Sequence, residues 1–387
     1  MTGAIIGIAA LSLVAWIYLL GFRGGFWRLG ERLDPSAPAP PSWPEVVAVV
    51  PARDEAPTIA ACLESLLAQD YPGRLSVVLV DDNSGDGTGA IAHRMAEADR
   101  RISVVAGSSL PAGWTGKPWA LLQGVARAAE TAPDARYYFF TDADVVHPPG
   151  TLRALVAKAE SDGRELVSLM VRLDCATTWE RLLIPAFVFF FRMLFPFAWV
   201  NDPARATAAA AGGCVLVRTS TLNRAGGLAA IRGTLIDDCA LAHAIKRSGG
   251  RLWLGLAESS RSLRVYTRLS DVWGLVARTA YTQLRHSPLL LLATVLGMIV
   301  LHLAPPLTLA ALPLHGSGPA AALAALAWLL MAAAYVPTVA YYRQPWPLAT
   351  SLPVAAVLYV AMTVDSALRH WRGQGGGWKG RYAAGGR

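Results

Sequence analysis

Long uncharged stretches stand near both ends of the chain. Residues 1–22 contain no charged side chain, and neither do residues 287–342 or 344–364. An α-helix rises about 1.5 Å per residue and a bilayer core is about 30 Å thick, so about 20 apolar residues are enough to cross a membrane. Turn-forming residues at 312–319 predict a break within the longest stretch. We therefore expect a transmembrane anchor at 1–22 and about three membrane segments within 287–364.

The basic residues around the first apolar stretch bear on its orientation. Arg23, Arg28 and Arg32 follow this stretch, whereas a cleaved signal peptide carries its basic residues first. A retained anchor with the following region on the inside is therefore favoured. Three later spans would then place the basic tail 365–387 outside, against the positive-inside rule. Either one segment is re-entrant or interfacial, with a break at residues 305–306, or the tail is an exception.

The middle region, residues 45–286, follows a basic, proline-rich linker at 23–44 and alternates between two patterns. Apolar, β-branched runs predict strands buried on both faces, and runs with a 3.6-residue apolar period predict helices. This alternation predicts an α/β domain with a Rossmann-like, mostly parallel sheet covered by helices on both faces. The predicted strands are 45–51, 76–82, 102–106 and 137–141, and the predicted helices are 58–69, 89–98 and 119–130.

A further apolar stretch, residues 182–200, lies inside this middle region. Pro185, Arg192 and Pro196 interrupt it. A membrane crossing here would put the motifs before and after it on opposite sides of the membrane. An interfacial helix rich in Phe is therefore favoured, with a buried core helix as the alternative.

Acidic residues follow three of the predicted strands. The first strand ends in the sequence PARDE at residues 51–55, the second in Asp81 and Asp82, and the fourth in Asp142-Ala143-Asp144. The carboxyl ends of parallel strands meet at one edge of a sheet, where ligands bind. Turn chemistry explains one such cluster, but three in order favour a site. Asp142 and Asp144 suit Mg²⁺ or Mn²⁺, which bind one or two carboxylates together with phosphates and waters.

Composition excludes several classes of protein. The chain of 387 residues is 54% hydrophobic and 16% charged, against roughly 25% charged in a soluble domain, which argues against a wholly soluble or a disordered protein. The net charge of +8 is concentrated beside the apolar segments, so a nucleic-acid partner is not expected. The four cysteines form no C-x-x-C pair. No dinucleotide fingerprint or Walker A sequence is present, which counts against a dehydrogenase or a P-loop ATPase.

The ordered motifs PARDE, VDDNS, GKPWAL, TDAD and DDCAL resemble those of glycosyltransferase family 2 with the GT-A fold, over about residues 45–290. The resemblance implies an inverting enzyme that uses a nucleotide-sugar donor. One departure is an Asp at 237 in place of the commoner Glu. Another is the final motif, residues 282–286, which keeps Arg285 but begins with Thr282 and ends in His286 rather than Trp. This second departure disfavours polymer synthesis. The implied roles are donor binding by Pro51, Arg53, Asp54, Glu55, Asp81, Asp82, Lys117, Asp142 and Arg285, a Mg²⁺ or Mn²⁺ ion at Asp142 and Asp144, and a general base at Asp238 beside Asp237.

Residues 278–285 and the tail 377–382 are similar to the glycosyltransferases associated with bacterial hopanoid synthesis. This narrower resemblance implies transfer of one sugar to a hopanoid-like lipid, by a multi-pass protein of the cytoplasmic (inner) membrane whose catalytic domain faces the cytoplasm. A polyprenyl-phosphate acceptor remains open, as does a non-enzymatic membrane scaffold. A transporter is disfavoured because the uncharged stretches offer few ionisable side chains.

Overall fold

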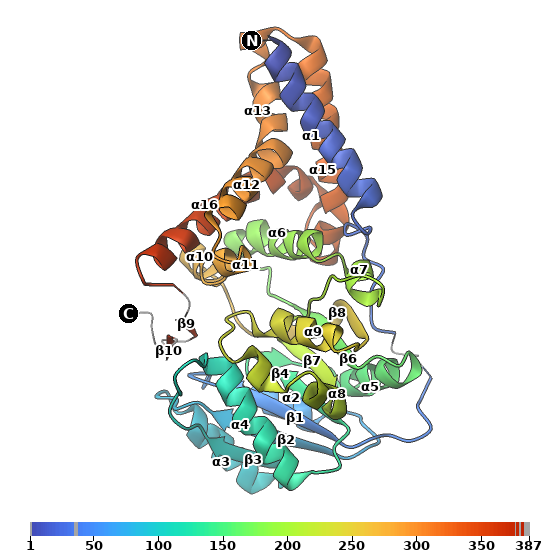
Figure 1. Cartoon of the computed structure of the whole chain (residues 1–387), viewed down its shortest axis with the longest axis vertical. Helices are drawn as coiled ribbons and strands as arrows, with labels where there is room; N and C mark the ends of the chain where they lie inside the picture. Colours follow the sequence, from blue (N-terminus) through green and yellow to red (C-terminus); the bar gives the residue numbers. More distant parts are fainter. Residues whose placement is uncertain (1, 35–37, 376, 379–380, 383–387) are drawn as a thin grey trace. The chain divides into compact units, whose positions relative to one another are not determined.

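The computed structural model describes residues 2–34, 38–375, 377–378 and 381–382. The chain forms two compact units (Figure 1). The sheet unit is built mainly from Glu31–Asp174 and Trp199–Val265. The helical unit is built from Met1–Gly30, Cys175–Ala198 and Tyr266–Gly375. The chain therefore leaves the sheet unit once, returns to it, and leaves it again.

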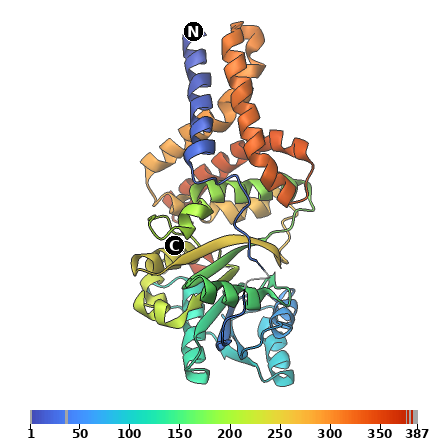
Figure 2. The same ribbon diagram turned by 90° about the vertical axis from the view of Figure 1, so that its right-hand side faces the viewer.

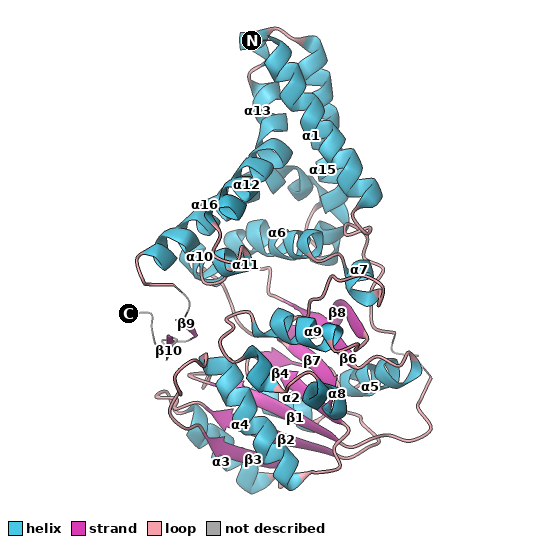
Figure 3. Ribbon diagram, in the orientation of Figure 1, coloured by secondary structure: helices cyan, strands magenta, loops and turns pink. Residues whose placement is uncertain are grey.

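An eight-stranded mixed sheet forms the centre of the described part of the sheet unit, with the order β3-β2-β1-β4-β7-β6-β8-β5 (Figure 3). Neighbouring strands from β3 to β4 are parallel, and β6 is parallel to β8. Strand β7 is antiparallel to both of its neighbours, and β5 is antiparallel to β8. The strands are β1 Val46–Ala52, β2 Leu75–Asp81, β3 Ile102–Ala106, β4 Tyr137–Thr141, β5 Val145–Val146, β6 Leu166–Arg172, β7 Cys214–Arg218 and β8 Leu252–Ser262.

Helices cover both faces of this sheet. Helices α2 (Ile59–Leu67), α3 (Thr88–Ala98) and α5 (Thr151–Ser161) pack on one face, against alternate side chains of β1. Helix α4 (Gly116–Thr131) packs on the other face, since a Cβ at its Gly124 would lie 2.4 Å from the Val49 side chain. Glycine is thus required there for close approach of helix and sheet. Every residue of β1 and β4 is buried, as the continuous apolar runs predict.

The predicted α/β class and the mostly parallel first half of the sheet are confirmed. The four predicted strands and three predicted helices are all present, with ends that move by no more than three residues. The antiparallel part was not predicted. There β8, with 11 residues, forms a long curved ribbon in Figure 2. The remaining short elements are α7 Phe197–Asn201, α8 Thr219–Arg224, a 3₁₀ helix Leu228–Ile231, α9 Asp237–Arg247, and an antiparallel pair β9 Gly377–Trp378 and β10 Arg381–Tyr382.

The described part of the helical unit contains four helices long and apolar enough to cross a membrane, Thr2–Phe22, Pro288–Ala310, Gly318–Tyr341 and Trp346–Trp371. They overlap the uncharged stretches 1–22, 287–342 and 344–364, whose role as membrane segments stays a prediction. The break near 312–319 contains the short helix α14 (Leu312–His315). In element terms they are α1 Thr2–Phe22, α12 Pro288–Met298 with a π-helical turn Ile299–Leu303 and α13 Ala304–Ala310, α15 Gly318–Tyr341, and a 3₁₀ turn Trp346–Ser351 with α16 Leu352–Trp371.

The predicted break at residues 305–306 is a local irregularity rather than an end. The helix continues through α13, and the π-helical turn lies just before the two prolines. Pro305 has no N–H to donate to the carbonyl of Leu301 four residues earlier. The indole N–H of Trp16 on α1 donates to that carbonyl instead, at 2.8 Å. This hydrogen bond replaces the missing helical one and joins α1 to the second apolar helix.

Most of the apolar stretch 182–200 lies in α6 (Thr178–Leu194), which belongs to the helical unit together with α10 (Leu269–Ala277) and α11 (Ala280–Gln283). The Phe189 ring contacts Tyr335 of α15, and the Phe190 ring contacts Tyr359 of α16. This face of α6 is therefore packed against other helices, while its position at a membrane interface stays a prediction. The grouping differs from the predicted domain 45–286, because residues 175–198 and 266–286 pack with the apolar helices.

Candidate active site

The loops that follow β1 and β2 hold each other by hydrogen bonds. The Arg53 guanidinium donates to the carbonyl of Asp82 at 2.5 Å. The N–H of Asp54 donates to the Ser84 hydroxyl at 3.0 Å, and the Asp54 carboxylate accepts from the N–H of Gly85 at 2.8 Å. Asp54 also has a φ of +50°, a left-handed conformation that Asp tolerates better than most residues. Hydrogen bonds thus connect the loops that carry the predicted donor-binding residues Arg53, Asp54 and Asp82.

The two acidic residues at the end of β2, Asp81 and Asp82, have different surroundings. Asp81 is the last residue of β2, and its carboxylate accepts a hydrogen bond from the N–H of Ser84 at 3.1 Å. Asp82 is fully buried, with its carboxylate 3.9 Å from the Arg53 guanidinium. The predicted contacts of these residues with a nucleotide stay predictions.

The two carboxylates that follow β4 face different cations. Asp142 lies 2.6 Å from the ammonium of Lys117. Asp144 accepts from the Arg264 guanidinium at 3.0 Å and from the Ser262 hydroxyl at 3.1 Å. One strand end therefore carries two negative charges, each balanced by a separate basic side chain.

Lys117 stands between two elements of the site. It lies in the first turn of α4, where the helix dipole disfavours a cation. Asp142 at 2.6 Å and Asp237 at 3.6 Å compensate for this position. Burial alone would lower the pKa of Lys117, but the two carboxylates raise it above its usual range. Lys117 therefore stays charged and can face a leaving phosphate.

Asp237 and Asp238 open helix α9, where acids are stabilised by the helix dipole. The Asp238 carboxylate accepts from the N–H groups of Gly212 and Cys239, both at 2.7 Å. Burial raises the pKa of Asp238 to about 6 and the nearby Asp237 adds to the rise, while Lys117 and the two N–H donors oppose it. A carboxylate with this pKa is matched to proton transfer near neutral pH.

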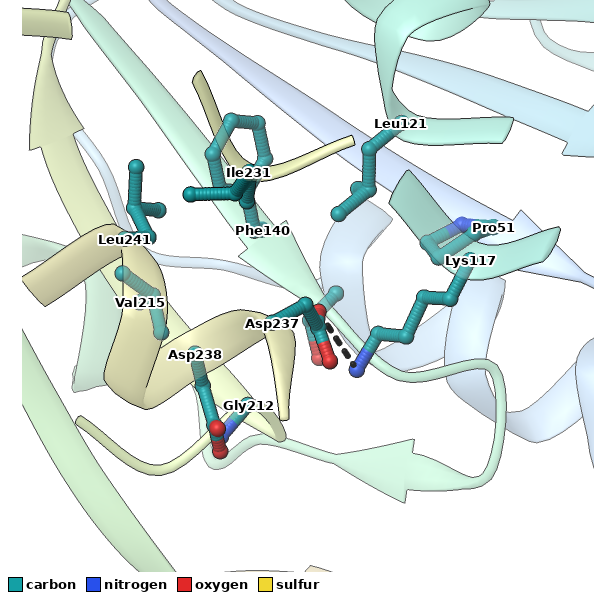
Figure 4. A pocket seen from close by; sticks show the side chains of 11 residues that line it. Pro51, Lys117, Leu121, Phe140, Gly212, Val215, Ile231, Asp237, Asp238 and Leu241 are labelled. Carbon is teal, nitrogen blue, oxygen red and sulfur yellow. Dashed lines mark hydrogen bonds and ion pairs between the residues drawn. The ribbon is translucent and has the colours of Figure 1, made fainter. Parts of the chain in front are cut away.

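A pocket brings these groups together with apolar side chains (Figure 4). In the figure Lys117 points toward Asp237, and Asp238 lies beside Gly212. A Cβ at Gly212 would lie 3.0 Å from the Lys117 ammonium and 3.3 Å from the Asp238 carboxylate, so glycine keeps this space open. The lining residues are Pro51, Lys117, Leu121, Phe140, Thr141, Gly212, Val215, Ile231, Asp237, Asp238 and Leu241.

The sheet unit thus brings most of the predicted site residues to one edge of the sheet. Arg285 is different, because it belongs to the helical unit, on an exposed turn with a φ of +53°. Its predicted contact with the diphosphate stays a prediction.

Sequence reasoning missed Arg264, Ser262 and Gly212. Arg264 is 120 positions from Asp144 and no short motif contains both. The cluster of Ser and Arg within residues 259–264, after the apolar start of β8, is the local signal that could have indicated Ser262 and Arg264.

The donor set at Asp142 and Asp144 fits a hard divalent cation. Two carboxylates two residues apart supply oxygen ligands, and the phosphates of a donor and waters can complete the shell. Among the residues that the structure describes, no group of three or more His, Cys, Asp or Glu could hold a metal ion, so a third protein ligand of these types is not part of this fit. His147, three residues after Asp144, is not available as a metal ligand, because both of its ring nitrogens are engaged by hydroxyl groups. They lie 2.9 Å and 3.0 Å from the hydroxyls of Thr141 and Ser260.

Residues 47–224 match the family model described as Glycosyl transferase family 2. Two curated relatives are each named N-acetylglucosaminyltransferase. The protein from Mesorhizobium japonicum is 37% identical over 86 residues, which are 21% of this chain and 20% of that protein. The protein from Bradyrhizobium diazoefficiens is 38% identical over 79 residues, which are 20% of this chain and 16% of that protein. The chain therefore matches only about a fifth of the length of these relatives.

Among solved structures, the mannosyltransferase PcManGT from Pyrobaculum calidifontis, in complex with GDP-Man and Mn²⁺, is similar in fold. The TM-score is 0.58 at 22% identity, over 93% of this chain and 99% of that chain. Residues 47–224 thus resemble glycosyltransferase family 2, and the predicted GT-A-like fold is confirmed; both findings support the predicted class of enzyme. The narrower resemblance to hopanoid enzymes rests on its motifs and stays a prediction.

Proposed function

We propose that the chain is a membrane-bound, inverting glycosyltransferase that moves one sugar from a nucleotide-sugar donor to a hydroxyl group of a lipid, with a hopanoid-like lipid as the acceptor class. One observation carries the proposal. A charged lysine, Lys117, stands between Asp142 and Asp237, and Asp238 has a raised pKa in the same pocket of a family 2 domain. In this proposal Asp238 is the general base, and Lys117 is the cation that faces the leaving group.

The proposed reaction is a single displacement. The Asp238 carboxylate removes the proton of the acceptor hydroxyl as its oxygen attacks the anomeric carbon. The bond from that carbon to the diphosphate oxygen breaks, and the configuration inverts because one displacement occurs. The Lys117 ammonium stabilises charge on the departing diphosphate. Mg²⁺ or Mn²⁺, when bound at Asp142 and Asp144, supplies further positive charge at the same place.

A lipid acceptor is supported by the helical unit. Four of its helices are long and apolar enough to span a membrane, and they precede and follow the sheet unit in the chain. The basic residues after the first helix support a cytoplasmic position for the sheet unit at the inner membrane. The motifs at 278–285 and 377–382 support a hopanoid-like acceptor, although Lys379 and Gly380 lie outside the described residues.

The names of the similar proteins suggest which donors to test first. The curated relatives are named N-acetylglucosaminyltransferases, and the similar solved structure holds GDP-Man. An N-acetylglucosamine donor and GDP-mannose therefore stand first in a panel of UDP- and GDP-sugars. The panel also includes glucose and galactose donors.

The test is transfer of radiolabelled sugar into lipid, using membranes that contain the full chain, native lipid extract and Mg²⁺ or Mn²⁺. We expect one discrete labelled lipid. Asp142→Ala/Asp144→Ala and Asp238→Asn should each abolish it, by a factor of about 10² to 10⁴ for loss of a general base. The exposed Asp134→Asn is the matched control and should leave transfer unchanged.

The variants also separate the alternatives. A polyprenyl-phosphate acceptor needs no base, so label that survives in Asp238→Asn but not in the Asp142/Asp144 variant would favour that acceptor. A folded chain that neither binds nor uses any donor of the panel would favour the non-enzymatic scaffold.

A further inference from the structure

The Arg264 side chain contacts two carboxylates, including Asp144, one of the two residues assigned to the divalent cation. Its Nε donates to Asp144 at 3.0 Å and a terminal guanidinium nitrogen donates to Glu55 at 2.7 Å. Glu55 follows β1 and Asp144 follows β4, so one side chain joins two strand ends. A guanidinium in this place balances the charge that a divalent cation would also balance.

The three side chains differ in how far they are exposed to solvent. Glu55 and Asp144 are 13% and 12% exposed, whereas the Arg264 side chain is 39% exposed. The backbone next to Arg264 is held, because the N–H of Leu263 donates to the carbonyl of Asp144 at 2.7 Å. The two carboxylates are thus largely enclosed, whereas part of the Arg264 side chain faces solvent and its neighbouring backbone is hydrogen-bonded to the Asp144 backbone.

We propose that Arg264 is a positioning residue that competes with the divalent cation for Asp144, so that cation and nucleotide-sugar bind together rather than independently. The inference rests on the proposed function, because it assigns the cation to Asp142 and Asp144. Before the donor binds, Arg264 holds Asp144 and weakens cation binding. When the cation binds, Arg264 gives up Asp144 and keeps Glu55.

Electrostatic forces decide when the cation replaces Arg264 at Asp144. A guanidinium in contact with Asp144 lies within a few ångströms of the cation's place and repels it. A nucleoside diphosphate brings negative charge that attracts both the cation and the displaced guanidinium. Binding of the diphosphate therefore strengthens cation binding, and the same factor applies in reverse, because coupling between two ligands is reciprocal.

The experiment measures Mn²⁺ affinity of the purified full chain in detergent, by the loss of the free Mn²⁺ signal in electron paramagnetic resonance. It is run without nucleotide and with saturating UDP or GDP. For the wild type we expect weak binding of Mn²⁺ alone and binding about tenfold or more tighter with one of the two nucleotides. Arg264→Gln should bind Mn²⁺ alone about tenfold more tightly than the wild type, and the nucleotide effect should shrink by a similar factor.

Two further variants control for charge and for folding. Arg264→Lys keeps the positive charge and should lie closer to the wild type than Arg264→Gln does. Arg261→Gln removes an exposed charge three residues away and should leave Mn²⁺ affinity unchanged. Thermal unfolding is recorded for each variant, so that only folded proteins are compared.

Equal or weaker Mn²⁺ binding in folded Arg264→Gln would overturn the inference, even if sugar transfer is found. Absence of Mn²⁺ binding in the wild type and in Arg264→Gln, with both nucleotides, would overturn both the inference and the metal role in the proposed function. Tighter binding in Arg264→Gln in a chain that transfers no sugar would leave the exchange standing and contradict the proposed function alone.

Discussion

The edge of the sheet and the core of the helical unit both contain charged side chains with partners inside the protein, but these partners differ in kind. In the helical unit, Arg192 is fully buried, donates to the backbone carbonyl of Arg28 and lies 5.3 Å from the Phe197 ring. At the sheet edge, Lys117 and Arg264 contact carboxylates that a substrate or a cation could also engage. The partners of Arg192 are a backbone carbonyl and an aromatic ring of the same unit. The partners of Lys117 and Arg264 are carboxylates, which can bind a cation or a substrate instead.

This difference indicates what each charge contributes. A carbonyl and an aromatic ring cannot leave their places, so the contacts of Arg192 contribute to stability. Carboxylates beside a pocket can take a new partner when a ligand arrives, so we expect Lys117 and Arg264 to contribute to binding and catalysis. Substitutions at the sheet edge should therefore change activity more than stability, and substitutions in the helical unit should do the reverse.

The largest expected effect is on catalysis by Lys117→Met. Loss of the charge opposite the leaving diphosphate should lower kcat by about 10² to 10³. Lys117 also lowers the pKa of Asp238, which is about 6, so the fall in activity at acid pH should begin at a higher pH in the variant than in the wild type. The measurement is kcat from about pH 5 to 9, where a protonated Asp238 cannot act as the base.

Lys158→Met is the control, because Lys158 of α5 pairs with Asp162, which directly follows that helix, and does not line the pocket. It should retain wild-type kcat and the same pH profile. Wild-type turnover in Lys117→Met would contradict the assignment of Lys117 to the leaving group.

The second effect concerns the start of α6. The Glu180 side chain is fully buried and accepts from three backbone N–H groups, those of Ala176, Thr177 and Tyr266. Glu180→Gln replaces one acceptor with a donor and should lower the free energy of unfolding by about 2 to 3 kcal/mol, as thermal unfolding in detergent would show. Activity per folded molecule should not change.

This effect should also depend on pH. Burial would raise the pKa of Glu180, but the backbone hydrogen bonds outweigh it and lower the pKa below the usual 4.5. The ionised form therefore contributes stability that is present above about pH 4.5 and is lost as the pH falls through the lowered pKa. The gap between wild type and variant should close in acid, while the exposed Glu64→Gln should show no gap at any pH.

The smallest effect is expected for Arg192→Met. The substitution removes the hydrogen bond to Arg28 and the contact with Phe197, but Met fills much of the same apolar space. The free energy of unfolding should fall by about 1 to 2 kcal/mol, again with unchanged activity per folded molecule. Arg181→Met, on the exposed side of α6, is the control and should unfold like the wild type. A large loss of activity in folded Arg192→Met would contradict the contrast between the two units.

The parts of the fold that the sequence predicted are those with a local cause. Strands β1 and β4 are buried on both faces, so their apolar runs are continuous and easily seen. The break near 312–319 follows from Pro and Gly in an otherwise apolar stretch. The antiparallel insertion of β7 has no such cause, because strand order depends on pairing between distant segments.

The site divides in the same way. Asp142, Asp144 and the pair Asp237–Asp238 stand in short motifs next to predicted elements. Arg264 reaches Asp144 only because β8 runs along the sheet, and Gly212 matters only because Lys117 and Asp238 both approach it. Such contacts depend on the assembled sheet and leave little trace in the local sequence.

The position of β7 has a consequence for biosynthesis. Strand β7 lies between β4 and β6, but it is translated after both of them and after α6, which belongs to the helical unit. While the ribosome makes residues 175–213, β4 and β6 therefore stand in the nascent chain without the strand that separates them. Unpaired strand edges of this kind are prone to join other chains. The facing edges of β4 and β6 therefore stay unpaired until β7 has been made and inserts between them.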